Sequence, residues 1–135
     1  ALGAAGVACP ADYCIGGVND RRSGLQAVAK VLALSPRPTA VLVDNNLGGV
    51  GLIRGLMDAG LRVGQDISVV VHGDIPQDTL LTGLNVTTVT QPTPQTTGIA
   101  LAEMVMQVLR DPESGPYQLL RQPALQVGSS SGPAD

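Results

Sequence analysis

Hydrophobic and polar residues alternate along this chain in blocks that predict strands and helices in turn. A β-type run covers residues 12–18, and short apolar runs at 39–43 and 67–71 fit strands that are buried on both faces. After Asp20, and again from about Asn46 to Ala59, apolar residues recur at the spacing of a helix face. A strand at 86–90, a helix at 95–109 and a last strand at 119–127 complete the series.

Strands that alternate with helices predict the α/β fold class, with a parallel sheet flanked by helices. Residues 1–127 are expected to form the folded region, with a long loop at 75–85, and the Ser-, Gly- and Pro-rich residues 128–135 a flexible tail. Pro123 places the last strand at a sheet edge or a bulge. The chain opens without Met, inside what reads as the end of a helix, so we expect a fragment of a longer protein.

Composition narrows the function classes. Hydrophobic residues make up 44% of the chain and charged residues 14%, which excludes a disordered chain and a coiled coil. Eight basic residues against eleven acidic ones give no positive field, and aromatics are limited to Tyr13 and Tyr117. We therefore expect no autonomous nucleic-acid binding. Apolar runs fall short of the roughly 20 residues that span a bilayer, so no membrane association is expected.

Polar residues follow each of the four predicted parallel strands. They are Asn19, Asp44–Asn46, His72–Asp74 and Gln91. Ligands of open parallel sheets bind outside the carboxyl ends of the strands, where these groups are expected to meet. Carboxamides donate and accept hydrogen bonds, which suits hydroxyl-rich ligands. The alternative is that Asn45 and Asn46 cap a helix and that Gln91 is a turn residue.

Catalytic and metal-binding alternatives are weaker. His72 with Asp74 could perform acid–base chemistry, but no G-x-S-x-G elbow is present and Ser68 lies in an apolar run. Cys9 and Cys14 could form a disulfide or a metal clip; the alternative of two ordinary thiols is favoured, because zinc usually needs four ligands and the His is far away. We expect no catalytic residue, no metal and no cofactor.

Two further patterns have simple explanations. The glycine-rich residues 48–51 match neither G-x-G-x-x-G nor a P-loop, which predicts close helix packing instead. Arg21–Arg22 could bind a phosphate group, but a basic pair without a glycine-rich loop is better explained as a solvated helix start.

Three segments together resemble the lactose/galactose-repressor (LacI/GalR) type of bacterial transcription regulators. Residues 37–46, Arg-Pro-Thr-Ala-Val-Leu-Val-Asp-Asn-Asn, are similar to the "P-T-A-hydrophobic-x-x-N-D" signature. Residues 59–70 are similar to the "G-L-x-V-P/G-x-D-I-S-V-V" segment, and residues 84–91 to "L-T-T-V-x-Q". The resemblance runs from about Gly17 to Leu109, and the ordered combination is specific.

The resemblance implies a fold like that of periplasmic sugar-binding proteins, with two α/β lobes around a ligand cleft. This chain would hold most of the C-terminal lobe, and the helix at 93–110 would pack toward the missing N-terminal lobe. Operator DNA would be bound through a helix-turn-helix headpiece absent from this chain. The family also implies a homodimer, through the face of the helix after the "N-D" pair, and a cytoplasmic location.

Carried over by position, Asn45 and Asn46 match the "N-D" pair, Gln91 the end of "T-T-V-x-Q", and Gly73–Asp74 the acidic pair of "G-[FY]-D-D". His72 stands where the family has an aromatic, and Asn19 falls near a position that often supplies a polar or stacking contact. Asn46 and Gly73 replace two family aspartates. The usual sugar ligand is therefore in question, and purines, amino-sugar derivatives and other metabolites stay open.

Three functional hypotheses follow. In the first, the chain is the effector-sensing region of a transcriptional repressor, which binds a small polar metabolite and controls operator binding allosterically. In the second, it belongs to an exported solute-binding protein with the same fold. In the third, it is an α/β enzyme that uses His72 and Asp74. The "D-I-S-V-V" wording favours the repressor.

Overall fold

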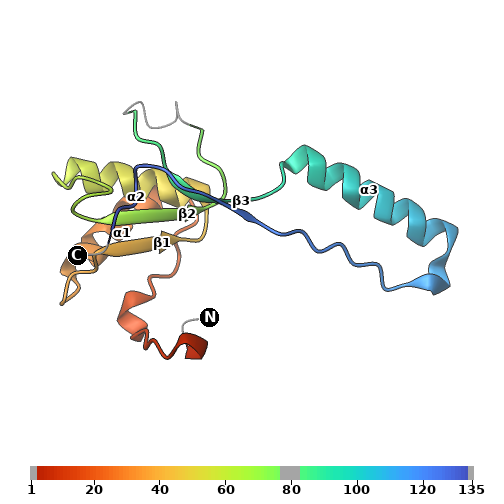
Figure 1. Ribbon diagram of the computed structural model, residues 1–135, viewed down its shortest axis with the longest axis horizontal. Helices are drawn as coiled ribbons and strands as arrows, with labels where there is room; N and C mark the ends of the chain where they lie inside the picture. The colour runs from red at the N-terminus through yellow and green to blue at the C-terminus, as the bar shows by residue number, and fades with distance from the viewer. Residues whose placement is uncertain (1–2, 77–82, 134–135) are drawn as a thin grey trace.

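The computed structural model describes residues 3–76 and 83–133, apart from the side chain of Ser114. Strands and helices alternate as the hydrophobic pattern predicts, and the α/β class is confirmed (Figure 1). The part of the expected 75–85 loop from 77 to 82 lies outside the described residues. The elements are η1 (Gly3–Ala5), η2 (Ala11–Tyr13), α1 (Arg21–Ala33), β1 (Ala40–Val43), α2 (Asn46–Asp58), β2 (Ser68–His72), β3 (Thr87–Thr90), α3 (Pro94–Arg110), η4 (Pro112–Ser114) and β4 (Ala124–Gln126).

The strands form a sheet in the order β1-β2-β3-β4. β1, β2 and β3 are parallel, with Val43 opposite Val71 and His72 opposite Val89. β4 pairs antiparallel with β3 at the edge of the sheet and begins directly after Pro123. The strand predicted over 119–127 is thus shorter than expected, because the chain before Pro123 does not pair, whereas its position at the sheet edge agrees with the prediction, since proline cannot donate to a ladder.

Helix α2 packs on β1 and β2, and α1 packs on α2. Glycines permit the close crossing of the two helices. A Cβ on Gly51 would overlap the main chain of Arg21, and a Cβ on Gly24 would overlap the carbonyl of Gly48. The glycine-rich residues 48–51 therefore bring two helix backbones together, as predicted.

Polar side chains fix the start of each long helix. Asp20 accepts a hydrogen bond from the Ser23 amide at 2.7 Å, and Ser23 Oγ accepts one from the Asp20 amide at 3.0 Å, which is a capping box. Asn45 accepts from the Gly48 amide at the start of α2, and Thr93 from the Thr96 amide at the start of α3. These caps satisfy backbone N–H groups that have no partner within a helix.

The hydrophobic core lies between α2 and the sheet. Ile53 and Leu56 of α2 are 0% exposed, as are Val69 and Val71 of β2. Alternate residues of β2 point to this face, and Val28 of α1 extends the same cluster. The core thus fixes the strand ends where the polar residues follow.

The predicted strand at 12–18 is wrong. This segment contains the turn η2 and then irregular chain. It is fastened near both ends of β1: the Tyr13 hydroxyl donates to the Pro36 carbonyl at 2.7 Å, and Asn45 Nδ2 donates to the Val18 carbonyl at 2.6 Å. The segment therefore follows the open edge of β1 without joining its ladder. Gly16 and Gly17, the latter at φ +80°, interrupt extended chain there.

Residues 128–133, expected to belong to a flexible tail, pack on the sheet instead. Ser130 is 0% exposed; its Oγ donates to the Val69 carbonyl at 2.6 Å and accepts from the Thr87 amide at 2.8 Å. The amide of Val69 donates to the Ser130 carbonyl at 2.7 Å. A Ser/Gly-rich composition suggested fraying, but these backbone and hydroxyl bonds need no large side chain. Residues 134 and 135 lie outside the described part.

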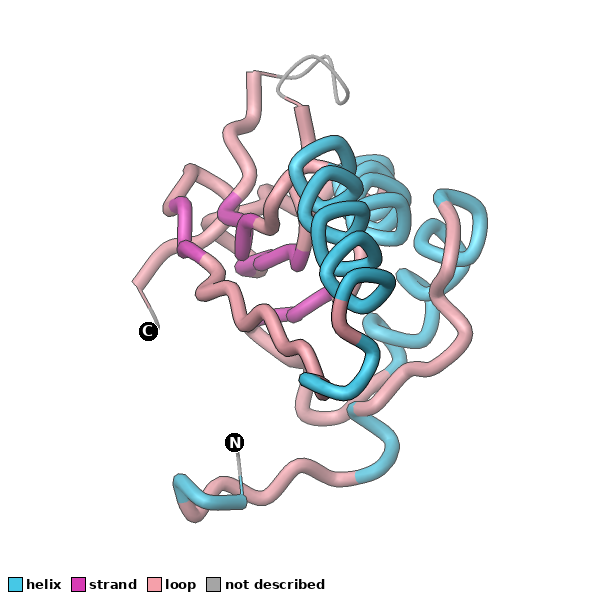
Figure 2. The backbone as a smooth tube through the Cα atoms, turned by 90° about the vertical axis from the view of Figure 1, so that its right-hand side faces the viewer, coloured by secondary structure: helices cyan, strands magenta, loops and turns pink. Residues whose placement is uncertain are grey.

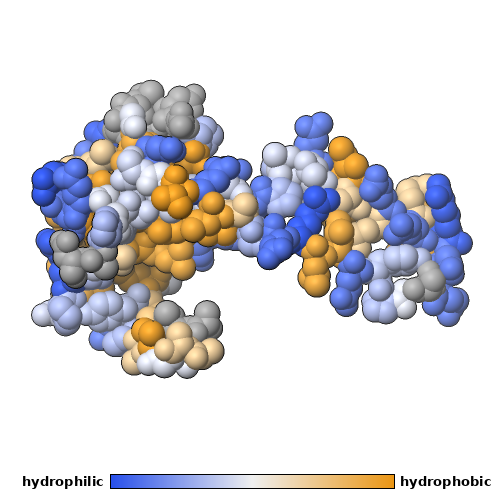
Figure 3. All heavy atoms as spheres, in the orientation of Figure 1, coloured by the Kyte–Doolittle hydropathy of each residue, from blue (hydrophilic) through white to orange (hydrophobic). Residues whose placement is uncertain are grey.

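The molecule divides into a body and an arm. The body contains α1, α2 and the sheet. The arm, residues 91–123, contains α3 and η4 and projects away from the body (Figure 1). Figure 2 looks along the arm, with α3 in front of the strands. Apolar side chains show along the arm's surface in Figure 3, and Leu101 and Leu109 of α3 are 57% and 70% exposed.

Candidate functional site

The carboxyl ends of β1, β2 and β3 form a polar rim. Because the strands are parallel and in register, the residues that follow them lie at the same edge of the sheet. The rim consists of Asn46 after β1, His72 and Asp74 at the end of β2, and Gln91 after β3. The structure therefore brings these four predicted residues together.

Asn46 connects β1 with β2. Its Nδ2 donates to the main-chain carbonyl of Asp74 at 3.2 Å, and the side chain is exposed. The carboxylate of Asp74 is not used by this bond, and Asp74 is exposed as well. Because both residues are exposed, the Asn46 amide oxygen and the Asp74 carboxylate can accept hydrogen bonds from a ligand.

Gly73 explains one departure from the family pattern. Its φ is +98°, in the left-handed region that favours glycine. The Gly73 amide donates to the Val89 carbonyl at 2.9 Å, which holds this turn against β3. A Cβ here would meet Asn46 at an ordinary 3.6 Å. Backbone conformation rather than space therefore favours glycine over aspartate at this position.

His72 and Gln91 join β2 to β3. Gln91 Nε2 lies 2.8 Å from His72 Nε2 and 3.4 Å from His72 Nδ1, so the amide can donate to the imidazole in the tautomer that leaves the facing nitrogen as an acceptor. His72 is half-buried and Gln91 is exposed. The bond orients the imidazole at the rim and leaves the Gln91 amide oxygen able to accept from another group.

Asn45 has a structural task. Its Oδ1 accepts from the Gly48 amide at 2.7 Å, and its Nδ2 donates to the Val18 carbonyl at 2.6 Å and to Asp44 Oδ1 at 2.9 Å. The side chain is thus engaged with the helix start, with Asp44 directly after β1 and with the segment before α1. It positions its neighbours Asp44 and Asn46.

Asn19 lies on the outer side of β1, away from Gln91. Together with Asp44 it lines a cavity of about 660 Å³ between residues 9–19, α1 and β1. Most of the lining is apolar, including Ile15, Val31 and Val41. Hydrogen bonds from Ser23 keep the pKa of Asp20, next to Asn19, below its ordinary value. Sequence reasoning missed this cavity, because it depends on the 12–18 segment not forming a strand.

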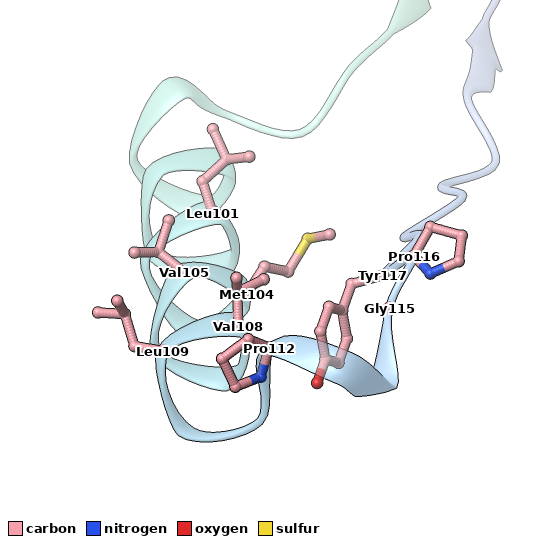
Figure 4. A pocket seen from close by; sticks show the side chains of 9 residues that line it. All are labelled: Leu101, Met104, Val105, Val108, Leu109, Pro112, Gly115, Pro116 and Tyr117. Carbon is pink, nitrogen blue, oxygen red and sulfur yellow. The ribbon is translucent and has the colours of Figure 1, made fainter.

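A second hollow, of about 440 Å³, lies on the arm between α3 and residues 112–117. Figure 4 shows Met104 reaching from α3 toward the segment with Pro116 and Tyr117. The lining is apolar apart from the Tyr117 hydroxyl, which donates to the Asp111 carbonyl at 3.2 Å. This hollow lacks the polar groups that bind a hydroxyl-rich ligand.

The described residues meet the requirements of neither a metal site nor a membrane-spanning helix. Within residues 3–76 and 83–133, no group of three or more His, Cys, Asp or Glu side chains is arranged to hold a metal ion. Over the same ranges, none of the helices has the length and apolar character required to cross a bilayer.

Comparison with known proteins identifies the family. The profile of the periplasmic binding protein-like domain matches residues 1–131. The HTH-type transcriptional regulator RafR of Escherichia coli is 32% identical over 111 residues, which are 82% of this chain and 33% of RafR. The probable HTH-type transcriptional repressor ExuR of Bacillus subtilis is 30% identical over 119 residues, which are 88% of this chain and 35% of ExuR. The chain thus spans about a third of these relatives.

Solved structures of transcriptional regulators have the same fold as this chain. A transcriptional regulator from Yersinia pestis superposes with a TM-score of 0.84 and 33% identity, over 95% of this chain and 45% of that one. A complex of the transcriptional regulator CelR with cellobiose gives 0.79 and 26% identity, over 96% of this chain and 39% of that one. The chain belongs to the periplasmic-binding-protein-like family of the LacI/GalR-type bacterial transcriptional regulators.

Proposed function

We propose that this region senses a small polar metabolite in a full-length repressor, and that Asn46, His72, Asp74 and Gln91 contact it. The observation that carries the proposal is the shared polar rim at the ends of three parallel strands. Asn46 and Gln91 are exposed there and keep amide oxygens for a ligand. The named complex of CelR with cellobiose supports a sugar-like effector. The region would perform no chemistry of its own.

Asn45 and Asn19 take secondary places in this proposal. Asn45 holds the rim through its three hydrogen bonds, and Asn19 borders the cavity beside β1. The rim has one Asp side chain after β2, because Asn46 and Gly73 stand where the family has aspartates. Compared with a family cleft that holds both aspartates, this rim offers two fewer charged hydrogen-bond acceptors to a ligand. Ligands that offer acceptors as well as donors therefore fit it better.

The exposed apolar face of α3 supports the two-lobe architecture that the family resemblance implies. Ile99, Leu101 and Val105 are each more than half exposed. A solvent-exposed apolar surface of this kind marks a contact site for another part of the protein or for a partner. The C-terminal-lobe assignment gives it a partner, since α3 would pack on the N-terminal lobe. The metabolite would then bind between the lobes.

Effector binding would act on DNA through a two-state equilibrium. A ligand shifts such an equilibrium only by its different affinity for the two states. Operator binding would require a helix-turn-helix headpiece from another part of the protein, a homodimer and a cytoplasmic location. The named transcription regulators among the relatives favour this over an exported solute-binding protein.

A thermal-shift screen of metabolites against the full-length protein tests the proposal, because a ligand of the folded state raises its melting temperature. For each hit, calorimetry compares the wild type with Asn46→Ala and Gln91→Ala. Loss of a buried hydrogen bond costs about 1–3 kcal/mol, so each variant should bind about 5- to 150-fold more weakly.

Gln26→Ala is the matched control, because Gln26 is an exposed amide on α1 away from the rim. Its affinity should equal that of the wild type. Unchanged affinity in both Asn46→Ala and Gln91→Ala would remove the rim from the binding site. Turnover of a hit that stops in His72→Ala while binding persists would favour an enzyme instead.

A further inference from the structure

Two cysteines lie side by side in the segment before α1. Cys9 and Cys14 flank the turn η2, and their Sγ atoms are 3.6 Å apart. Both are free thiols and both are exposed. Thiols this close need only a small movement to reach bonding distance, because a disulfide joins sulfurs at about 2.05 Å.

The two cysteines lie in the wall of the cavity beside β1. Cys9, Cys14 and the intervening Tyr13 line the cavity beside β1, which Asn19 and Asp44 also line. Tyr13 is fastened to the Pro36 carbonyl at 2.7 Å. A covalent ring over residues 9–14 would therefore stiffen one wall of this cavity.

We infer that Cys9 and Cys14 form a reversible intramolecular disulfide, and that this segment is a redox-modified site. Intracellular disulfides are typically transient and redox-sensing, in agreement with exposed thiols that are not built into a core. A structural metal clip is a poorer fit, because zinc sites use four ligands. Within the described ranges no third ligand joins the pair.

The oxidant is a small-molecule disulfide such as oxidised glutathione. One protein thiolate attacks a glutathione sulfur, the glutathione S–S bond breaks, and one glutathione thiolate leaves. The second protein thiolate then attacks the protein sulfur of the mixed disulfide and releases the other glutathione. Overall, two protein thiols lose two electrons and two protons, and the disulfide of oxidised glutathione gains them and becomes two glutathione thiols.

The two sulfurs influence each other before they react. The hydrogen bond with Cys14 raises the pKa of the Cys9 thiol above its ordinary value, with a smaller contribution from burial. Because the thiolate is the attacking species, oxidation should become faster as the pH rises.

Equilibration of the full-length protein in mixtures of reduced and oxidised glutathione tests the inference. After alkylation and digestion, mass spectrometry follows the peptide that contains both cysteines, which loses the mass of two hydrogen atoms on ring closure. The same equilibrium is measured in concentrated urea. Native proximity should favour the ring about tenfold or more over the unfolded chain. Equal or weaker ring formation in the native protein would overturn the inference.

Hydrogen exchange tests the consequence for the cavity wall. The amides of Tyr13 and Cys14 donate within the turn, to Pro10 and Ala11, and should exchange several-fold more slowly after oxidation. The Cys9→Ser/Cys14→Ser double variant is the control and should show no response to glutathione. Unchanged exchange across residues 10–19 in the oxidised wild type would show that the ring does not stiffen this wall. The inference is independent of the effector proposal.

Discussion

The body and the arm use the same helical pattern with opposite results. In α2, Leu52, Ile53 and Leu56 are at most 2% exposed, because the sheet and α1 cover them. In α3, Leu101, Val105 and Leu109 are all more than half exposed. Periodicity therefore reports that a helix has an apolar face, whereas burial of that face depends on a partner that the periodicity does not identify.

The largest expected effect comes from deleting a buried side chain of the body. Leu56→Ala should lower the free energy of unfolding by about 2–5 kcal/mol, because it removes apolar contacts and leaves a cavity in a 0% exposed site. Leu109→Ala, at 70% exposure on the arm, is the matched comparison. Urea unfolding of residues 1–135 measures both.

In that chain Leu109→Ala should change stability by less than about 0.5 kcal/mol. In the full-length protein the same variant should become costly if a second lobe covers α3. Equal losses for both variants in residues 1–135 would remove the distinction between body and arm.

Glycine substitutions sharpen the comparison. Gly51→Ala places a Cβ against the main chain of Arg21, so the helices must separate, at a cost of about 1–3 kcal/mol. Gly98→Ala on α3 meets nothing within 4 Å and should stabilise by about 0.5–1 kcal/mol through helix propensity. Opposite shifts in melting temperature are expected. Shifts of the same sign would contradict the close crossing.

Ser130→Ala tests whether the chain returns from the arm into the body. It removes a hydroxyl that donates to Val69 and leaves the buried amide of Thr87 without its acceptor. The expected loss is about 1–2 kcal/mol by denaturant unfolding. Ser129→Ala is the nearby control, because Ser129 is exposed and should cost less. A silent Ser130→Ala would support the original expectation of a loose tail.

The smallest effect concerns acid stability of the body. Hydrogen bonds from the Arg62 side chain and amide lower the pKa of Asp66 to about 2. A depressed folded-state pKa gives stability that is present above the unfolded value and is lost as the pH falls, here between about pH 4 and pH 2.

Melting temperature measured across this window should fall less steeply in Asp66→Asn than in the wild type. Asp58→Asn is the control: the Asp58–Arg54 pair is also spaced i,i+4 and joins Asp58 to the Arg54 side chain, whereas Asp66 accepts from the Arg62 main-chain amide as well as from its side chain. Identical slopes in wild type and Asp66→Asn would mean that this carboxylate is irrelevant to acid unfolding.

Much of the fold follows from local pattern. The runs at 39–43 and 67–71 are β1 and β2 nearly residue for residue, and Asn45 and Asp20 cap helices as such residues do. The rim could be anticipated because parallel strands must end at one edge. Which groups become bonded to one another could not, since Asn46 meets Asp74 and Gln91 meets His72 only through the register of the sheet.

The failures have one cause in common. Residues 12–18 have strand composition but do not join the ladder of β1, and residues 128–133 have loop composition but bond to β2 and β3. Both outcomes depend on long-range backbone partners, which side-chain composition does not encode. The cavity beside β1 escapes sequence reasoning for the same reason. The contact of Cys9 with Cys14 is local, and the sequence offered it only as the less favoured alternative to two ordinary thiols.

The antiparallel pairing of β3 with β4 has a mechanical consequence. Thr90 lies opposite Ala124, so the chain leaves the sheet and re-enters it at adjacent points. Because two covalent connections lie side by side, the arm would bend relative to the sheet more easily than it would twist. Gln91 is the first residue of the outgoing connection, so swinging of α3 would be transmitted directly to its contact with His72.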